Sequence, residues 1–157
     1  MTMMTPTSMP ARGGLAGLYG QALQFAASVP LSAVQLVARL AVANVFWQSS
    51  QSKLASWPVT VQLFALEYRL PVLDPAVAAA LATAAELSGA ILILFGLFSR
   101  LAALMLLGVV ATIQIFVYPG HWGEHLTWAA PLLLVFARGA GVISLDHIAG
   151  RFFSRER

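Results

Sequence analysis

The chain has 157 residues, of which 59% are hydrophobic and only 10% are charged, and its mean hydropathy is +0.81. Soluble domains are about 45–50% apolar and about 25% charged, so this composition excludes an ordinary soluble globule and a nucleic-acid-binding surface. The absence of cysteine excludes disulfide exchange, thiolate catalysis and cysteine-ligated metal sites within this chain.

The N-terminal region predicts a helix that lies on a membrane surface. Apolar residues recur at steps of three and four, namely Leu15, Leu18, Ala22, Phe25 and Val29. The alternative is a cleaved signal peptide, but the single upstream Arg12 and the internal Gln21 and Gln24 favour retention. Four methionines upstream, Met1, Met3, Met4 and Met9, are candidate soft ligands for copper(I).

Four longer apolar segments follow, at residues 31–47, 75–98, 100–118 and 126–145. A helix needs about 20 predominantly apolar residues to cross a bilayer, so each segment is a candidate span. The connection around Ser99 and Arg100 is so short that spans two and three must be antiparallel neighbours.

Between the first two spans, residues 57–68 predict a second interfacial helix, with Pro58 in its first turn. Its apolar face would carry Trp57, Val61, Phe64 and Tyr68, opposite Thr60 and Glu67. We expect this helix to cover the outer end of the spans.

These segments predict an all-α membrane protein, a four-transmembrane-helix bundle with an N-terminal amphipathic helix and an interfacial helix in the first outer loop. The expected organisation is an N-terminal tail and helix (1–30), a membrane domain (31–147) and a basic tail (148–157). Cytoplasmic loops carry the excess of Lys and Arg. Arg12, Arg100, Arg151, Arg155 and Arg157 fall on one side, against Lys53 and Arg69 on the other. Both termini are therefore expected in the cytoplasm.

Three ionisable residues, Arg39, Glu86 and Arg138, fall inside the expected spans at similar estimated depths. Such residues are costly in a membrane and usually pair inside the bundle. Small residues around Glu86, including Ala82 and Gly89, would let a neighbouring helix approach closely. The cluster could simply set helix register, or it could serve a function: Glu86 could carry a proton, and an arginine could hold an anionic or quinone-like ligand.

The outer turn before span four contains His121, Glu124 and His125. On a helix the two histidines would share a face and could bind a metal ion, with Glu124 as a further ligand. Pro119, Gly120 and Gly123 instead favour an aromatic loop without metal. The pair Asp146 and His147 has the character of a helix end, not of an acid/base dyad.

With these residues in place, the chain resembles the DoxX family of small four-helix bacterial membrane proteins. The resemblance runs from about Leu36 to Phe152 and rests on FWQSSQSKL (46–54), FALEYRLPVL (64–73), AELSGAILILFGLFSRLAAL (85–104) and ARGAGVISLDH (137–147). Lys53, Glu86, Arg100, Arg138 and Asp146 match the family pattern. The stretch FVYPGHWGEHLTWA (116–129) is similar to DoxX-type proteins found beside genes for copper-associated secreted peptides.

The resemblance implies a multi-pass protein of the bacterial cytoplasmic (inner) membrane that is linked to redox or metal stress, with a quinone or copper as candidate cofactors. Its implied partners are the lipid bilayer and another membrane or periplasmic protein, with a homo-oligomer as an option. Three functional hypotheses follow. The first is an accessory subunit of a redox or metal-stress system. The second is a quinone-reacting oxidoreductase subunit that needs an electron-donating partner, and the third is a small proton-coupled transporter component using Glu86.

Overall fold

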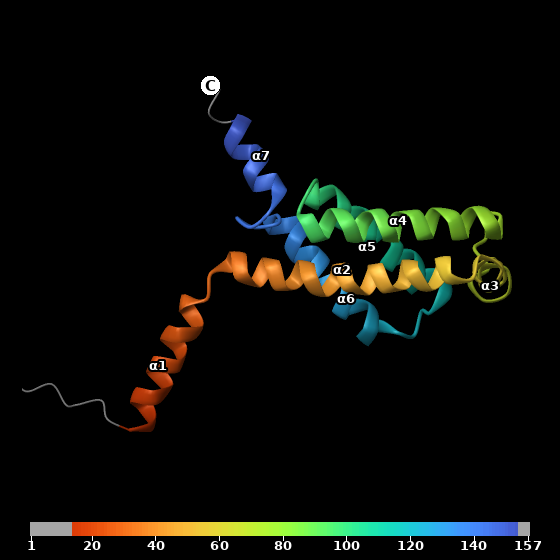
Figure 1. Ribbon diagram of the computed structural model, residues 1–157. Coiled ribbons are helices and arrows are strands. Elements are labelled where there is room, and N and C mark those ends of the chain that lie inside the picture. Colours follow the sequence, from red (N-terminus) through yellow and green to blue (C-terminus); the bar gives the residue numbers. More distant parts are fainter. Residues whose placement is uncertain (1–13, 154–157) are drawn as a thin grey trace, which may run out of the picture. The chain divides into compact units, whose positions relative to one another are not determined.

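A computed structural model describes residues 14–153, and all regular elements within them are helical (Figure 1). In chain order they are α1 (Leu15–Ser28), α2 (Leu31–Ala55), α3 (Trp57–Leu63), the π-helix η1 (Phe64–Tyr68), α4 (Pro75–Phe95), α5 (Ser99–Thr112), the π-helix η2 (Ile113–Val117), α6 (Trp122–Arg138) and α7 (Leu145–Phe153). The prediction of an all-α chain is confirmed for this range. The tail methionines Met1, Met3, Met4 and Met9, with Arg12, Arg155 and Arg157, lie outside the described residues.

The helix α1 belongs to a unit that ends at Pro30, and the other helices form a second unit that begins at Leu31. No residue of α1 is buried, and Leu15 and Phe25 are 85% and 76% exposed. The expected helix is present. Its place on a membrane surface stays a prediction.

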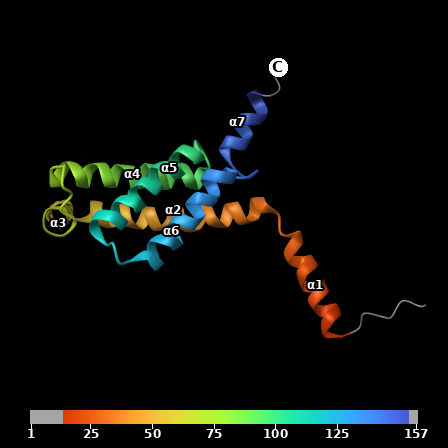
Figure 2. The ribbon, with the colours of Figure 1, turned by 180° about the vertical axis from the view of Figure 1, so that it is seen from behind.

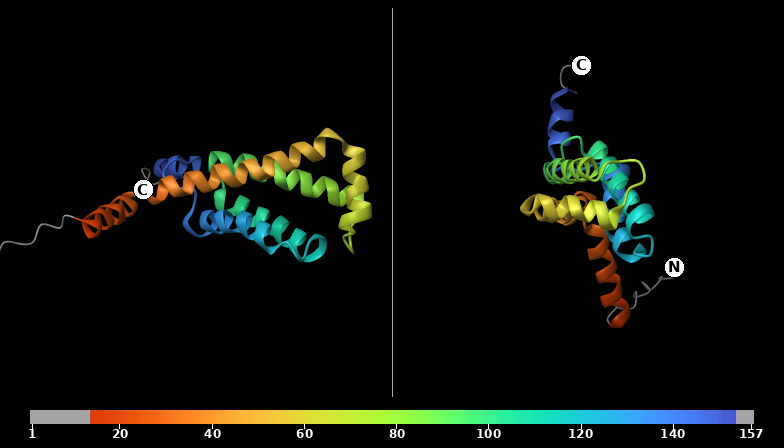
Figure 3. Two further views of the ribbon diagram at one scale, coloured as in Figure 1. Left: turned by 90° about the horizontal axis from the view of Figure 1, so that it is seen from below. Right: turned by 90° about the vertical axis from the view of Figure 1, so that its right-hand side faces the viewer.

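In the second unit, α2 packs against α4 and α6, and α5 packs against the same two helices. Figures 1 and 2 show α2 and α4 side by side, and Figure 3 shows α5 and α6 on one side of this pair. The core between them is apolar: Val42, Ala43, Phe46, Ala90, Ile93, Ala102, Ala103, Leu106, Val110, Leu132 and Val135. We call the end of this unit that carries α3 the α3 end, and the opposite end the α7 end.

Glycines set two features of α4. A Cβ at Gly89 would lie 2.6 Å from Leu106 Cδ2, so this glycine lets α5 approach closely. Gly96 ends the helix with a φ of 64°, and the N–H of Leu97 donates to Leu92 O at 3.0 Å. This is a Schellman-type ending, and it stops α4 at Phe95, before the expected residue 98.

Two other boundaries differ from the sequence expectation. The first span was expected to end at Trp47, but α2 continues to Ala55, which brings Lys53 into the helix. The fourth was expected to run to Leu145, but α6 ends at Arg138 because Gly139 and Gly141 adopt positive φ values of 80° and 84°. A separate helix, α7, follows, and it includes residue 148, where the basic tail was expected to begin.

The helix expected at 57–68 is present as α3 followed by η1. Phe64 is buried as expected, but Thr60 is buried too, contrary to its expected place on the opposite face. Its hydroxyl donates to Lys53 O at 2.8 Å, so a polar contact explains the burial.

By length and composition, two helices can cross a membrane, Pro75–Phe95 and Ser99–Val117, with mean hydropathies of 2.0 and 2.1. The number rises to three when α1 and α2 are counted together as one broken span. Over the described residues, then, the chain is a helical protein with two or three candidate membrane spans.

Candidate functional site

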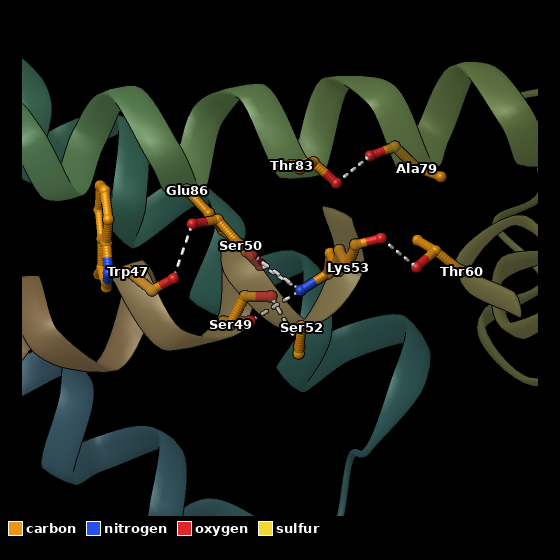
Figure 4. A network of polar contacts seen from close by, with 9 residues as sticks. All are labelled: Trp47, Ser49, Ser50, Ser52, Lys53, Thr60, Ala79, Thr83 and Glu86. Carbon is orange, nitrogen blue, oxygen red and sulfur yellow. Dashed lines mark hydrogen bonds and ion pairs between the residues drawn. The ribbon is translucent and has the colours of Figure 1, made fainter. Parts of the chain in front are cut away.

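The centre of the site is a buried ion pair between α2 and α4 (Figure 4). Lys53 Nζ lies 2.7 Å from Glu86 Oε2, 3.0 Å from Glu86 Oε1 and 2.7 Å from Ser49 Oγ. The two charged side chains are 10% and 2% exposed. Because an ammonium has three N–H donors, these contacts satisfy all of them.

Local structure explains why the pair forms here. Lys53 lies in the last turn of α2, where the helix dipole favours a cation. Ser49, one turn earlier, places its hydroxyl beside the ammonium. Glu86 lies on the buried face of α4 with Thr83 and Gly89, which faces α2 and α5.

The pair lies beside two cavities. One, of about 350 Å³, is mainly apolar, and Glu86 is the only charged residue among those that line it. The other, of about 260 Å³, carries polar groups that include Ser49, Lys53, Glu124 and His125. Glu86, Tyr68 and Ile113 line both cavities, so the two spaces share a wall that includes Glu86.

A second buried polar contact borders the smaller cavity. Gln114 Nε2 donates to Pro119 O at 2.7 Å, and Gln114 Oε1 lies 2.5 Å from His125 Nδ1. Because the amide nitrogen is used by Pro119, Oε1 must accept and Nδ1 must carry the proton. The other ring nitrogen of His125, Nε2, takes no part in this contact. The ring of Trp128, whose centroid lies 5.3 Å from that of His125, also lines the smaller cavity.

Two tyrosines line these cavities: Tyr68 lines both, and Tyr118 lines the smaller one. The Tyr118 hydroxyl donates to Glu67 Oε1, and this hydrogen bond raises the pKa of Tyr118 to about 12. Burial raises the pKa of Tyr68, and the carboxylates of Glu86 and Glu67 add to that shift. The two rings are in edge contact, with centroids 6.2 Å apart. Both hydroxyls therefore stay protonated at neutral pH and can donate hydrogen bonds.

The expected cluster of Arg39, Glu86 and Arg138 is not assembled. The partner of Glu86 is Lys53, and Arg39 contacts backbone near Ile93, about 10 Å further along α4. The sequence estimate placed these residues in one layer because it counted depth from assumed helix ends. The expected pairing of Glu86 with an arginine was therefore wrong.

Arg39 instead ties three segments together at the α7 end. Its guanidinium donates to Ile93 O at 2.8 Å, Leu94 O at 2.5 Å, Ala140 O at 3.0 Å and Ile143 O at 2.5 Å. The last carbonyls of a helix have no partner within it, so the cation stabilises the end of α4. Arg39 is thus satisfied by carbonyl groups and not by a carboxylate.

The other family-pattern residues also lie at the α7 end. Arg138 is exposed, and Gln35 caps its helix by donating to Arg138 O at 3.1 Å and Gly139 O at 2.9 Å. Arg100 is exposed on α5. Asp146 accepts from Phe98 N at 2.7 Å and Ser99 N at 2.9 Å, so it caps α5, as expected of a helix end.

The candidate metal ligands lie at the start of α6. This segment was expected to be a loop through Gly123, but the helix begins at Trp122 and includes His125. His121 and Glu124 are exposed and His125 is buried, with the two histidine ring centroids 6.4 Å apart. Within residues 14–153, no group of three or more His, Cys, Asp or Glu residues is arranged to hold a metal ion.

Sequence reasoning noted Lys53 but missed its pairing, and it missed Gln114 altogether. Lys53 was placed outside the first span because that span was expected to end at Trp47, although Ser49 and Lys53 have the spacing of neighbours on one helix face. Gln114 is the only amide side chain in the segment 99–117, which is otherwise almost wholly apolar. A lone amide in such a segment was the signal that could have identified it.

Fold and site together define a helical membrane protein built around a buried lysine-glutamate pair. A family model described as DoxX matches residues 34–119, more than half of the chain, and the protein therefore belongs to the DoxX family. The matched range includes Arg39, Lys53, Glu86 and Arg100. Comparison with curated proteins and with solved structures gives no match.

Proposed function

We propose that this protein is an accessory subunit of a redox or metal-stress system in the bacterial cytoplasmic membrane, and that it binds a quinone-class ligand at the Lys53–Glu86 pair. The observation that carries the proposal is the pair's position between a polar and an apolar cavity. A quinone has a polar ring and a long apolar tail, so it needs two such spaces side by side.

The residues present fit that ligand. The Tyr68 hydroxyl can donate to a ring carbonyl, and His125 Nε2 can accept from a hydroxyl of the reduced form. Trp128 and Phe46 supply aromatic surface in the smaller cavity, and Leu81, Met105 and Val109 line the larger one. A bound quinone would supply electron-carrier chemistry. The chain's own residues would hold the ring and shield the tail from water.

A four-span arrangement with both termini in the cytoplasm is part of the same proposal. The packing of α2, α4, α5 and α6 supports it. Exposed arginines at the α7 end, Arg100, Arg138 and Arg151, outnumber the single exposed Arg69 at the α3 end. Lys53 is buried in an ion pair, so it no longer counts as a loop charge, and the asymmetry that favours a cytoplasmic α7 end becomes stronger.

The lack of native cysteine allows a clean topology test. Val72 is 89% exposed in the loop at the α3 end, and Arg151 is exposed on α7. In intact cells, a membrane-impermeant maleimide should label Val72→Cys, and it should label Arg151→Cys only after permeabilisation. The reverse pattern would overturn the orientation.

The link to metal stress rests on the resemblance of residues 116–129 to DoxX-type proteins encoded near copper-associated secreted peptides. We propose a membrane or periplasmic partner of such a system at the α3 end, where Trp122 is 60% exposed beside His121. Cross-linking in cells from a photoreactive residue at position 122, compared with one at position 95, tests this. A partner captured equally from both positions contradicts the assignment.

The ligand is tested on the purified full chain in mild detergent, by solvent extraction and mass spectrometry of co-purifying quinones. Ala85 lines the apolar cavity, whereas Ala84 is exposed on the same helix and lines neither cavity. Ala85→Leu should lower the bound quinone at least tenfold, and Ala84→Leu should leave it unchanged. Equal trace amounts in wild type and both variants would refute the quinone proposal.

A further inference from the structure

Another cavity lies at the α7 end, away from the ion pair, and the proposed function does not use it. Its volume is about 820 Å³. Arg100 from the first turn of α5 and Arg138 from the last turn of α6 both line it, together with Gly139 and His147. Two cationic side chains from different helices therefore face one space.

Neither arginine forms an ion pair with a residue that the structure describes. Both are exposed, and within residues 14–153 the only ion pair is Lys53–Glu86. Asp146 also lines the cavity, but its carboxylate accepts from Phe98 N, Ser99 N and Ser99 Oγ, the last at 2.5 Å. These bonds hold the Asp146 carboxylate at the start of α5, so the two guanidinium groups have no carboxylate partner among the residues that line the cavity.

The backbone keeps the two arginines close. Gly139 follows Arg138 directly, and a Cβ built on it would lie 3.9 Å from Arg100 Nε. The Arg100 side chain thus passes over the residue next to Arg138. The positive φ of 80° at Gly139 turns the chain at this point, so α6 ends beside the start of α5.

Exposed apolar side chains also line the cavity. Phe98, Leu101, Val142 and Leu31 are 65%, 67%, 57% and 49% exposed, and all four line it. Phe98 holds a left-handed backbone conformation with a φ of 45°, at the turn between α4 and α5. A cavity lined by two cationic side chains and by exposed apolar side chains suits a ligand that is anionic at one end and apolar at the other.

We infer that the Arg100–Arg138 cavity is a binding site for the phosphate group of an anionic phospholipid. Guanidinium groups bind phosphate oxygens with paired, charge-assisted hydrogen bonds, and basic pockets between membrane helices hold anionic headgroups. The exposed apolar lining residues contact the acyl chains. Arg39 takes no part, because backbone carbonyls occupy its guanidinium. The site is independent of the quinone proposal and lies at the other end of the molecule.

The test measures thermal stabilisation of the full chain in mild detergent on addition of phosphatidylglycerol. Phosphatidylcholine, whose zwitterionic headgroup has a phosphate but no net charge, is the comparison. The wild-type protein should be stabilised by phosphatidylglycerol and not by phosphatidylcholine. The double variant Arg100→Gln/Arg138→Gln should bind it about thirtyfold more weakly, from the loss of two charges near the headgroup. Arg69→Gln/Arg151→Gln removes the same charge outside this cavity and should behave as wild type.

Two further measurements distinguish a phospholipid from free phosphate, and paired guanidinium hydrogen bonds from charge alone. Inorganic phosphate alone should give no stabilisation; full stabilisation by inorganic phosphate would show a free-anion site and overturn the lipid assignment. Arg100→Lys/Arg138→Lys keeps the charge but loses the paired donors, so it should bind with intermediate affinity. Equal stabilisation of the wild type and the Arg100→Gln/Arg138→Gln variant by phosphatidylglycerol would refute the proposed site.

Discussion

The ammonium group of Lys53 bridges both carboxylate oxygens of Glu86, at 2.7 and 3.0 Å, with almost no exposure of either side chain. Lys53 comes from the end of α2 and Glu86 from the middle of α4. The pair therefore fixes how these two helices lie along one another, and at the same time it is the only ion pair in the described range.

Removal of one member of this pair should destabilise the protein more than removal of both. Glu86→Gln or Lys53→Met leaves a buried charge without a partner, which costs about 3–5 kcal/mol in other proteins, whereas the double variant leaves no charge. Unfolding with SDS in mild detergent measures the difference. Glu124→Gln is the matched control, because Glu124 is exposed; Asp74 caps α4 and is unsuitable. Single variants as stable as that control would contradict the structural role of the pair.

Arg39→Lys should destabilise the α7 end although it keeps the charge. An ammonium is a point charge and cannot reach both the end of α4 and the loop at Ala140 and Ile143. Loss of these charged hydrogen bonds, each worth about 1.5–3 kcal/mol, should lower the free energy of unfolding by about 3 kcal/mol or more. Hydrogen exchange should speed up at 139–144. The exposed Arg151→Lys should change neither measurement.

Two glycine substitutions should have opposite effects. Gly89→Ala places a Cβ within 3.0 Å of three Leu106 atoms, and overpacking of this kind costs about 1–3 kcal/mol. Gly108→Ala meets nothing within 4 Å and should stabilise α5 by about 0.5–1 kcal/mol through helix propensity. Melting temperatures in detergent compare the two. A Gly89→Ala protein that melts above wild type would show that α4 and α5 are further apart than described.

The Tyr118–Glu67 hydrogen bond predicts a pH dependence at alkaline pH. The folded-state pKa of Tyr118 is about 12 and its ordinary value is 10.0, so the folded state holds this proton more tightly than the unfolded state. The resulting stabilisation is complete below pH 10 and is lost between pH 10 and 12.

Absorbance of tyrosinate against pH, as the difference between wild type and Tyr118→Phe, isolates this titration. Glu67→Gln removes the carboxylate that accepts the hydrogen bond and should move the Tyr118 titration towards pH 10. An unchanged midpoint in Glu67→Gln would show that the carboxylate does not hold the proton.

Much of the fold could be predicted from the sequence because its signals are local. Apolar periodicity predicted the helices at 15–28 and 57–68, and the apolar segment expected to begin at residue 75 does begin there as α4. The combination of high hydropathy and motifs indicated the family, which the match over residues 34–119 confirms. Helix ends were less accurate where glycines with positive φ decided them, as at Gly96 and Gly139.

The identity of the charge partners was decided only by the tertiary structure. The sequence showed that Glu86 and Arg39 were costly in a membrane and needed partners, but the partner depends on how far each helix extends and how it is rotated against its neighbour. Because α2 continues to Ala55, Lys53 reaches Glu86; because α4 ends at Phe95, its free carbonyls lie beside Arg39. Helical periodicity gives the face of one helix, whereas a contact across two helices also needs their relative shift and rotation, which packing alone determines.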